Sequence, residues 1–130
     1  MQWKIAAVAA LAATTAIAEH AWAAASDYVF ELVSAEVKKG EDVAIAVRLI
    51  SKATGNPVTD AVIFRSRVDM APDGMAEMES PVTALPPKEP GIYPFTADLP
   101  MPGRYQLSVA AKGQGEQETV IGKVVIKANK

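Results

Sequence analysis

The sequence contains no cysteine, and it has a single histidine, His20, and two tryptophans, Trp3 and Trp22. All three of these residues fall within the first 25 positions. Without cysteine, no disulfide or thiolate metal site can form, so an apolar core must hold the domain together. If the first 25 residues are removed, the chain also lacks the commonest general base and the thiol nucleophile. We therefore expect a protein that is not an enzyme.

Residues 1–25 have the pattern of a secretory signal peptide. A basic residue precedes the apolar run 5–18, and the small residues Ala21 and Ala23 form an A-x-A cleavage site. The apolar run is shorter than the roughly 20 residues that a membrane-spanning helix needs. We therefore predict a periplasmic domain at 26–130, with no stable membrane insertion after cleavage.

The charges of the chain are nearly balanced. Its 13 Lys and Arg residues against 15 Asp and Glu residues give a net charge of −2. Lys4 and Glu19 are the two charged residues of the leader, so its removal leaves this value unchanged. A weakly acidic chain has no electrostatic footprint for nucleic acid or for an anionic membrane. We therefore expect neither as a partner.

Downstream of the leader, apolar residues alternate with polar ones in short runs that are separated by turn residues. This pattern predicts an all-β fold, a small antiparallel immunoglobulin-like β-sandwich of about seven strands. The turn-and-tyrosine motif "PGIY" at 90–93 recurs as "PGRY" at 102–105, each copy opening a strand. The strand runs lie at 28–34, 43–50, 61–68, 82–87, 91–99, 104–112 and 119–127.

The methionines outside the leader are confined to turn-like segments. Met70, Met75 and Met78 lie in "MAPDGMAEM", and Met101 lies in "LPMPG". A thioether is a soft neutral ligand that selects Cu(I), and similarly Ag(I), over hard cations. It carries no titrating proton, so metal binding through it depends little on pH. These four residues are therefore the candidate metal ligands.

Three other interpretations of the methionine segment remain open. Methionines in a loop at the end of a sandwich can form a lid over the core, because their adaptability suits irregular gaps. They can also form an apolar patch for a protein partner. The nearby carboxylates raise Ca²⁺ as a rival ligand, but their spacing does not fit the D-x-[DN]-x-[DN]-G loop. These carboxylates are Asp69, Asp73, Glu77 and Glu79.

The C-terminal part of the sequence resembles a known family. The stretch "VIFRSRVDMAPDGMAEMESPV", followed by "PGIYPFTADLPMPGRYQLSVAAKGQGEQETVIGKVVIKA", is similar to FixH-like/YtkA-like exported domains, above all those found with heavy-metal efflux systems. The resemblance covers roughly 43–128 and implies an immunoglobulin-like sandwich in the periplasm that handles copper or silver. The ligands it implies are again Met70, Met75, Met78 and Met101.

Two departures from FixH-type members narrow this expectation. Those members are usually membrane-anchored and linked to cytochrome oxidase assembly, whereas this leader looks cleavable. The absence of histidine also argues against a Cu(II) site. We therefore predict a periplasmic Cu(I)/Ag(I)-binding carrier or buffer for heavy-metal efflux, working with a protein partner in efflux or metalloenzyme assembly. The alternative is a non-metal interaction module that docks on an efflux or cytochrome oxidase assembly partner.

Overall fold

The computed structural model describes residues 27–113 and 119–130. The signal peptide predicted at 1–25 lies outside these residues, as does most of the "GQGEQ" turn. Within the two described ranges, the chain forms strands and one short 3-10 helix, η2 (Ala71–Asp73). No helix in this part of the chain is long and apolar enough to cross a bilayer.

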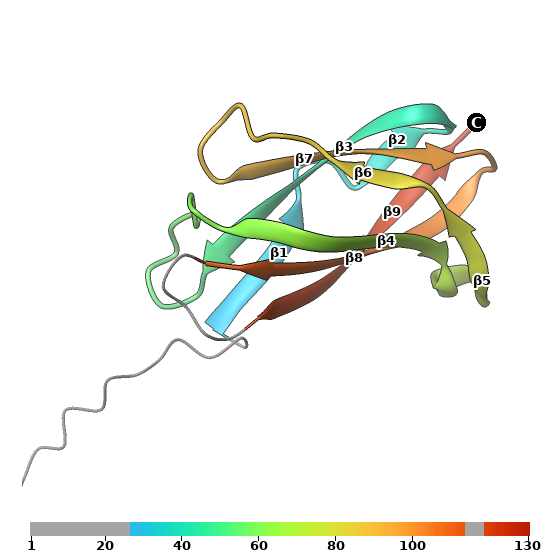
Figure 1. The fold of residues 1–130 in the computed structure, drawn as a ribbon. Helices are drawn as coiled ribbons and strands as arrows, with labels where there is room; N and C mark the ends of the chain where they lie inside the picture. Colours follow the sequence, from blue (N-terminus) through green and yellow to red (C-terminus); the bar gives the residue numbers. More distant parts are fainter. Residues whose placement is uncertain (1–26, 114–118) are drawn as a thin grey trace, which may run out of the picture.

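The described residues form nine strands in two stacked sheets, as Figure 1 shows. One sheet has the order β1-β3-β7-β6 and the other has the order β2-β9-β8-β4-β5. The strands are β1 (Tyr28–Leu32), β2 (Glu36–Lys38), β3 (Gly40–Ser51), β4 (Val62–Met70), β5 (Met75–Ser80), β6 (Val82–Ala84), β7 (Ile92–Leu99), β8 (Gly103–Lys112) and β9 (Val120–Asn129).

This topology confirms the predicted all-β sandwich. The strand orders of the two sheets are those of an immunoglobulin-like fold. Every pair of named strands is antiparallel except β2 and β9, which run parallel. The expected count of about seven strands is too low, because β2 has only three residues and β5 lies in the methionine segment, which the sequence indicated to be turn-like. Alternation over three residues gives no distinct sequence signal.

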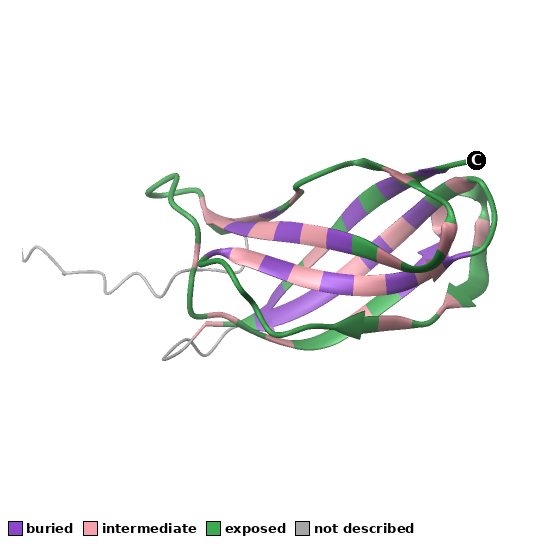
Figure 2. Ribbon diagram, turned by 90° about the horizontal axis from the view of Figure 1, so that it is seen from above, coloured by how far each residue is buried: buried purple, intermediate pink, exposed green. Residues whose placement is uncertain are grey.

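The core lies between the two sheets and is built by strict alternation. In β7 every second residue from Tyr93 to Leu99 is buried, and Tyr105, Leu107 and Val109 of β8 face them from the other sheet. Figure 2 shows this as bands of buried and less buried residues along the strands. Since successive side chains point to opposite faces of a strand, one apolar set fills the space between the layers.

Strands β1 and β9 approach each other closely across the core. The ring of Phe30, which is 7% exposed, lies directly against the backbone of Gly122. A Cβ atom at position 122 would overlap three ring carbons of Phe30. Glycine is therefore required here for packing.

Both tyrosines of the repeated Pro-Gly-x-Tyr motif fix backbone with their hydroxyl groups. The Tyr93 hydroxyl donates to Val58 O (2.6 Å) and accepts from Ala61 N (3.1 Å). The Tyr105 hydroxyl donates to Met101 O (2.9 Å) and accepts from Met101 N (3.2 Å). The second arrangement is the tyrosine corner known from immunoglobulin-like sandwiches. It holds the β7–β8 turn, which contains Met101.

Candidate metal-binding site

The segment between β4 and β5 is a tight turn flanked by two methionines. Strand β4 ends at Met70 and β5 begins at Met75, and these two residues are register partners. Pro72 lies in the first turn of η2, where its missing N–H costs nothing. Gly74 ends the helix in the left-handed region (φ 76°), and its N–H donates to Ala71 O at 2.9 Å. The turn itself is therefore confined to residues 71–74. The expectation that the three methionines of this segment lie in a turn is wrong, because Met70 lies in β4 and Met75 and Met78 lie in β5.

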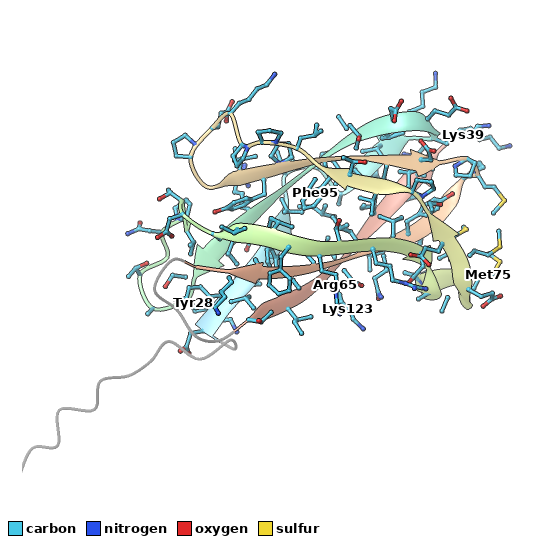
Figure 3. The ribbon with its side chains drawn as sticks, in the orientation of Figure 1. Tyr28, Lys39, Arg65, Met75, Phe95 and Lys123 are labelled. Carbon is cyan, nitrogen blue, oxygen red and sulfur yellow. The ribbon has the colours of Figure 1, made fainter. Side chains whose placement is uncertain are left out.

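The four predicted ligands differ in burial. Met70 is 2% exposed and belongs to the core, whereas Met75 is half-buried and packs against the core. Met78 and Met101 are exposed, at 45% and 37%. In Figure 3 the sulfur atoms that can be seen gather at the end of the sandwich where Met75 is labelled. From the sequence alone the four methionines were equivalent candidates as ligands. The structure shows that Met70 is also part of the core.

The turn that carries Met101 is fastened to η2 by a three-point contact. The Arg104 backbone N–H donates to Asp73 Oδ2 and its Nε donates to Asp73 Oδ1, both at 2.8 Å. Arg104 Nη2 also donates to Pro72 O at 2.7 Å. In addition, Cε of Met70 lies against Gly103. A Cβ atom built at position 103 would lie only 2.8 Å from this Cε. Met70 and the turn bearing Met101 are therefore neighbours.

Met78 lies in an irregular stretch of β5. The register passes from Asp69↔Glu79 directly to Met70↔Met75, so residues 76–78 have no partner in β4. Arg67 holds this bulge with hydrogen bonds from Nη1 to Glu79 Oε2 (3.1 Å) and from Nη2 to Ala76 O (2.9 Å). The bulge thus has a defined shape that leaves Met78 exposed.

The candidate soft ligands at this end of the molecule are thioethers. Among the residues that the structure describes, no group of three or more His, Cys, Asp or Glu side chains could hold a metal ion. Four methionines come from β4, β5 and the β7–β8 turn, which are held together as described above. Neutral sulfur donors fit a soft monovalent ion and do not fit Ca²⁺ or Mg²⁺.

Sequence reasoning missed the charged residues that hold the methionine segments in place. Asp69 is 4% exposed, and its carboxylate accepts from Arg67 Nε and from Ala71 N, both at 2.9 Å. Burial of this carboxyl raises its pKa, but the hydrogen bonds and the positive charge of Arg67 outweigh that effect and lower the pKa. The backbone N–H and guanidinium of Arg104 likewise lower the pKa of Asp73.

From the lowered pKa values of Asp69 and Asp73 we predict that the protein loses stability in acid. The pKa of each carboxyl group is lower in the folded state than its ordinary value. The contribution of both groups to the free energy of unfolding is therefore complete at any pH above that ordinary value. It is lost as the pH falls from about 4 through the lowered pKa values. Urea unfolding at a series of pH values should therefore show a steeper loss below about pH 4 for the wild type than for D69N/D73N. Parallel curves for the two proteins would contradict this prediction.

A separate concave feature lies on the outer side of the β1-β3-β7-β6 sheet. It is an open groove of about 620 Å³ between that sheet and the segment before β7. No methionine lines it, so it provides no soft ligand. Its lining includes Val33, Ala46, Leu85, Pro86, Ile92 and Pro94.

Comparisons with known proteins place the chain in a family. Solved structures that resemble it include the ZirS C-terminal domain, with 18% identity, a TM-score of 0.45 and coverage of 82% of this chain and 68% of that one. Another is a conjugative transposon lipoprotein from Bacteroides eggerthii DSM 20697, with 13% identity, a TM-score of 0.34 and coverage of 80% and 98%. No curated protein matches the chain. A family model described as YtkA-like matches residues 23–110, and the chain therefore belongs to the YtkA-like family.

Proposed function

We propose that this protein is an exported Cu(I)- or Ag(I)-binding domain that carries or buffers the metal in the periplasm for heavy-metal efflux. The observation that carries the proposal is that the end of β4, strand β5 and the β7–β8 turn, which bear the four methionines, meet at one end of the sandwich. The sulfur atoms that can be seen in Figure 3 lie at that end. Membership of the YtkA-like family and the predicted leader support export. The proposed role is binding rather than catalysis, with a protein partner that receives the metal.

The differing exposure of the methionines suits an exchangeable site. Met78 and Met101 present their thioethers to solvent, so an incoming ion meets them first. Met75 is half-buried and pairs in register with Met70, which gives the site a rigid side. Because thioethers do not titrate, the affinity for Cu(I) is expected to stay nearly constant as the pH falls toward 5.

The test is an anaerobic titration with Cu(I) against a competing chelator. The variant M78L/M101L keeps the apolar bulk at two exposed positions and removes only the sulfurs. Its affinity for Cu(I) is expected to fall at least about tenfold. The triple variant M70L/M75L/M78L, which also alters core packing, is expected to lose at least as much. An unchanged unfolding midpoint without copper is the control for M78L/M101L.

Two results would reject the proposal: no tight Cu(I) binding by the wild type, or wild-type affinity in both leucine variants. A ligand that binds only the folded state also raises the melting temperature as its concentration rises. Absence of such a rise with Cu(I) would count equally against a metal site.

The exposure of Met78 and Met101 also favours a second candidate, a non-metal docking module for an efflux or oxidase-assembly partner. Under this alternative, M78L/M101L keeps partner binding because leucine retains the apolar surface. Copper would then leave the melting temperature unchanged.

A further inference from the structure

The outer face of the β9-β8-β4 layer carries a concentration of positive charge. Six of the chain's 13 Lys and Arg residues lie on these three strands, although the chain as a whole has a net charge of −2. All six are exposed. We call this the basic face, and its cations are Arg65, Arg67, Arg104, Lys112, Lys123 and Lys127.

The strand register brings these cations close together. Lys123 is paired with Ser108, which is paired in turn with Arg67, so one row across three strands has a cation at each end. Lys127 pairs directly with Arg104 in the neighbouring part of the sheet. Adjacent strands are about 4.8 Å apart, so these cations share one patch. Figure 3 shows Arg65 and Lys123 projecting on the same side of the molecule.

The positive charge of the face is only partly compensated. Arg67 pairs with Asp69 and Glu79, Arg104 pairs with Asp73, and Lys127 lies 3.8 Å from Glu36. Within ranges 27–113 and 119–130, no ion pair is formed by Arg65, Lys112 or Lys123, although the charge of Lys123 contributes to lowering the pKa of Asp69. These three side chains are therefore the cations on the face that are most available to a partner's carboxylates.

Large apolar side chains lie among the cations. Along β9 the exposed positions alternate between apolar and basic residues, with Ile121 69% exposed and Val125 48% exposed beside Lys123. Phe64, which adjoins Arg65 at the bulge in β4, is 54% exposed. Apolar side chains interspersed with cations fit a protein interface, because such interfaces combine apolar contacts with charge complementarity.

We propose that the basic face docks an acidic, partly apolar surface of a partner protein. The charge of the face selects an acidic partner, and the outer side of the sheet presents its apolar side chains for contact with a folded surface. A symmetric dimer through this face would bring like charges together, which disfavours a second copy as the occupant. This proposal goes beyond metal binding and does not depend on it. Arg67 and Arg104 also fasten the methionine segments, so a docked partner would lie beside that end.

The experiment follows backbone amide shifts of the exported protein as an acidic peptide of alternating glutamate and leucine is added. Shift changes are expected on β4, β8 and β9, and higher salt should reduce them. The variant R65E/K123E is expected to bind the peptide at least about tenfold more weakly. The matched control K52E/K88E changes the net charge equally at exposed loop positions off this face and should bind like the wild type. V125S, which leaves all charges in place, should weaken binding by about threefold.

Several outcomes would overturn the proposal. Equal weakening by R65E/K123E and K52E/K88E would mean that net charge alone matters. If the peptide caused no amide shift changes, or caused them only on other strands, this face would be excluded as the docking site. Binding of phosphatidylglycerol vesicles without binding of the peptide would assign the face to a lipid surface. Self-association in sedimentation that R65E/K123E abolishes would assign it to a second copy. All substituted side chains are exposed, and an unchanged amide spectrum without peptide checks that each variant folds.

Discussion

Replacing Gly122 with alanine is expected to lower the free energy of unfolding by about 3 kcal/mol. The new methyl group would overlap the ring of Phe30, which is itself buried in the core. Either the ring leaves its position or β1 and β9 move apart, and both changes reduce contact across the sandwich. Urea denaturation of the two proteins, monitored by circular dichroism, measures the loss.

A double-mutant cycle with Phe30→Ala identifies the cause of this effect. F30A alone should cost about 3–5 kcal/mol, because it removes a buried aromatic ring. In the F30A background, G122A should then cost well under about 1 kcal/mol, since the clash is gone. If the two losses simply add, the packing of Phe30 against Gly122 is not the reason for the glycine.

Replacing Tyr105 with phenylalanine is expected to lower the free energy of unfolding by about 2 kcal/mol. The hydroxyl satisfies both the N–H and the carbonyl of Met101, and the side chain is 1% exposed. Phenylalanine keeps the ring packing but leaves both backbone groups without this partner. The β7–β8 turn would loosen, and Cu(I) affinity in the proposed site should fall with it.

Tyr93→Phe is the matched control for this prediction. Its hydroxyl also bonds a backbone carbonyl and a backbone N–H, but at the start of β7, at the opposite end of the sandwich. Y93F should therefore lower stability by a similar amount while leaving Cu(I) affinity unchanged. Equal changes in Cu(I) affinity for Y93F and Y105F would show that the loss of affinity comes from general destabilisation and not from loosening of the turn that carries Met101.

The strands that the sequence predicted well are those that alternate over many residues. Strand β7 shows this most clearly, because each inward residue from Tyr93 to Leu99 is apolar and buried. Strand β2 escaped prediction because three residues cannot display a period of two. Strand β5 escaped prediction because it has no apolar alternation and follows directly on the turn residues Pro72, Asp73 and Gly74. The parallel pairing of β2 with β9 depends on chain geometry and has no local sequence signal.

For the candidate site, the sequence predicted which residues to consider but not how they are held. The confinement of methionine to two segments was visible, whereas the burial of Met70 depends on packing beneath Gly103. Asp73 and Arg104 are 31 residues apart, so nothing local indicates that they meet. The basic face was hidden for a related reason, because a net charge of −2 averages over both outer surfaces.

The irregular pairing of β5 has a consequence for how copies of this protein behave when crowded. Strand β5 is the outermost strand of its sheet, and an exposed regular edge invites strands of other molecules to add to it. The unpaired residues 76–78 interrupt that edge and distort its backbone. The carbonyl of Ala76 is also occupied by Arg67. The same bulge that exposes Met78 to solvent therefore disfavours edge-to-edge aggregation through this sheet.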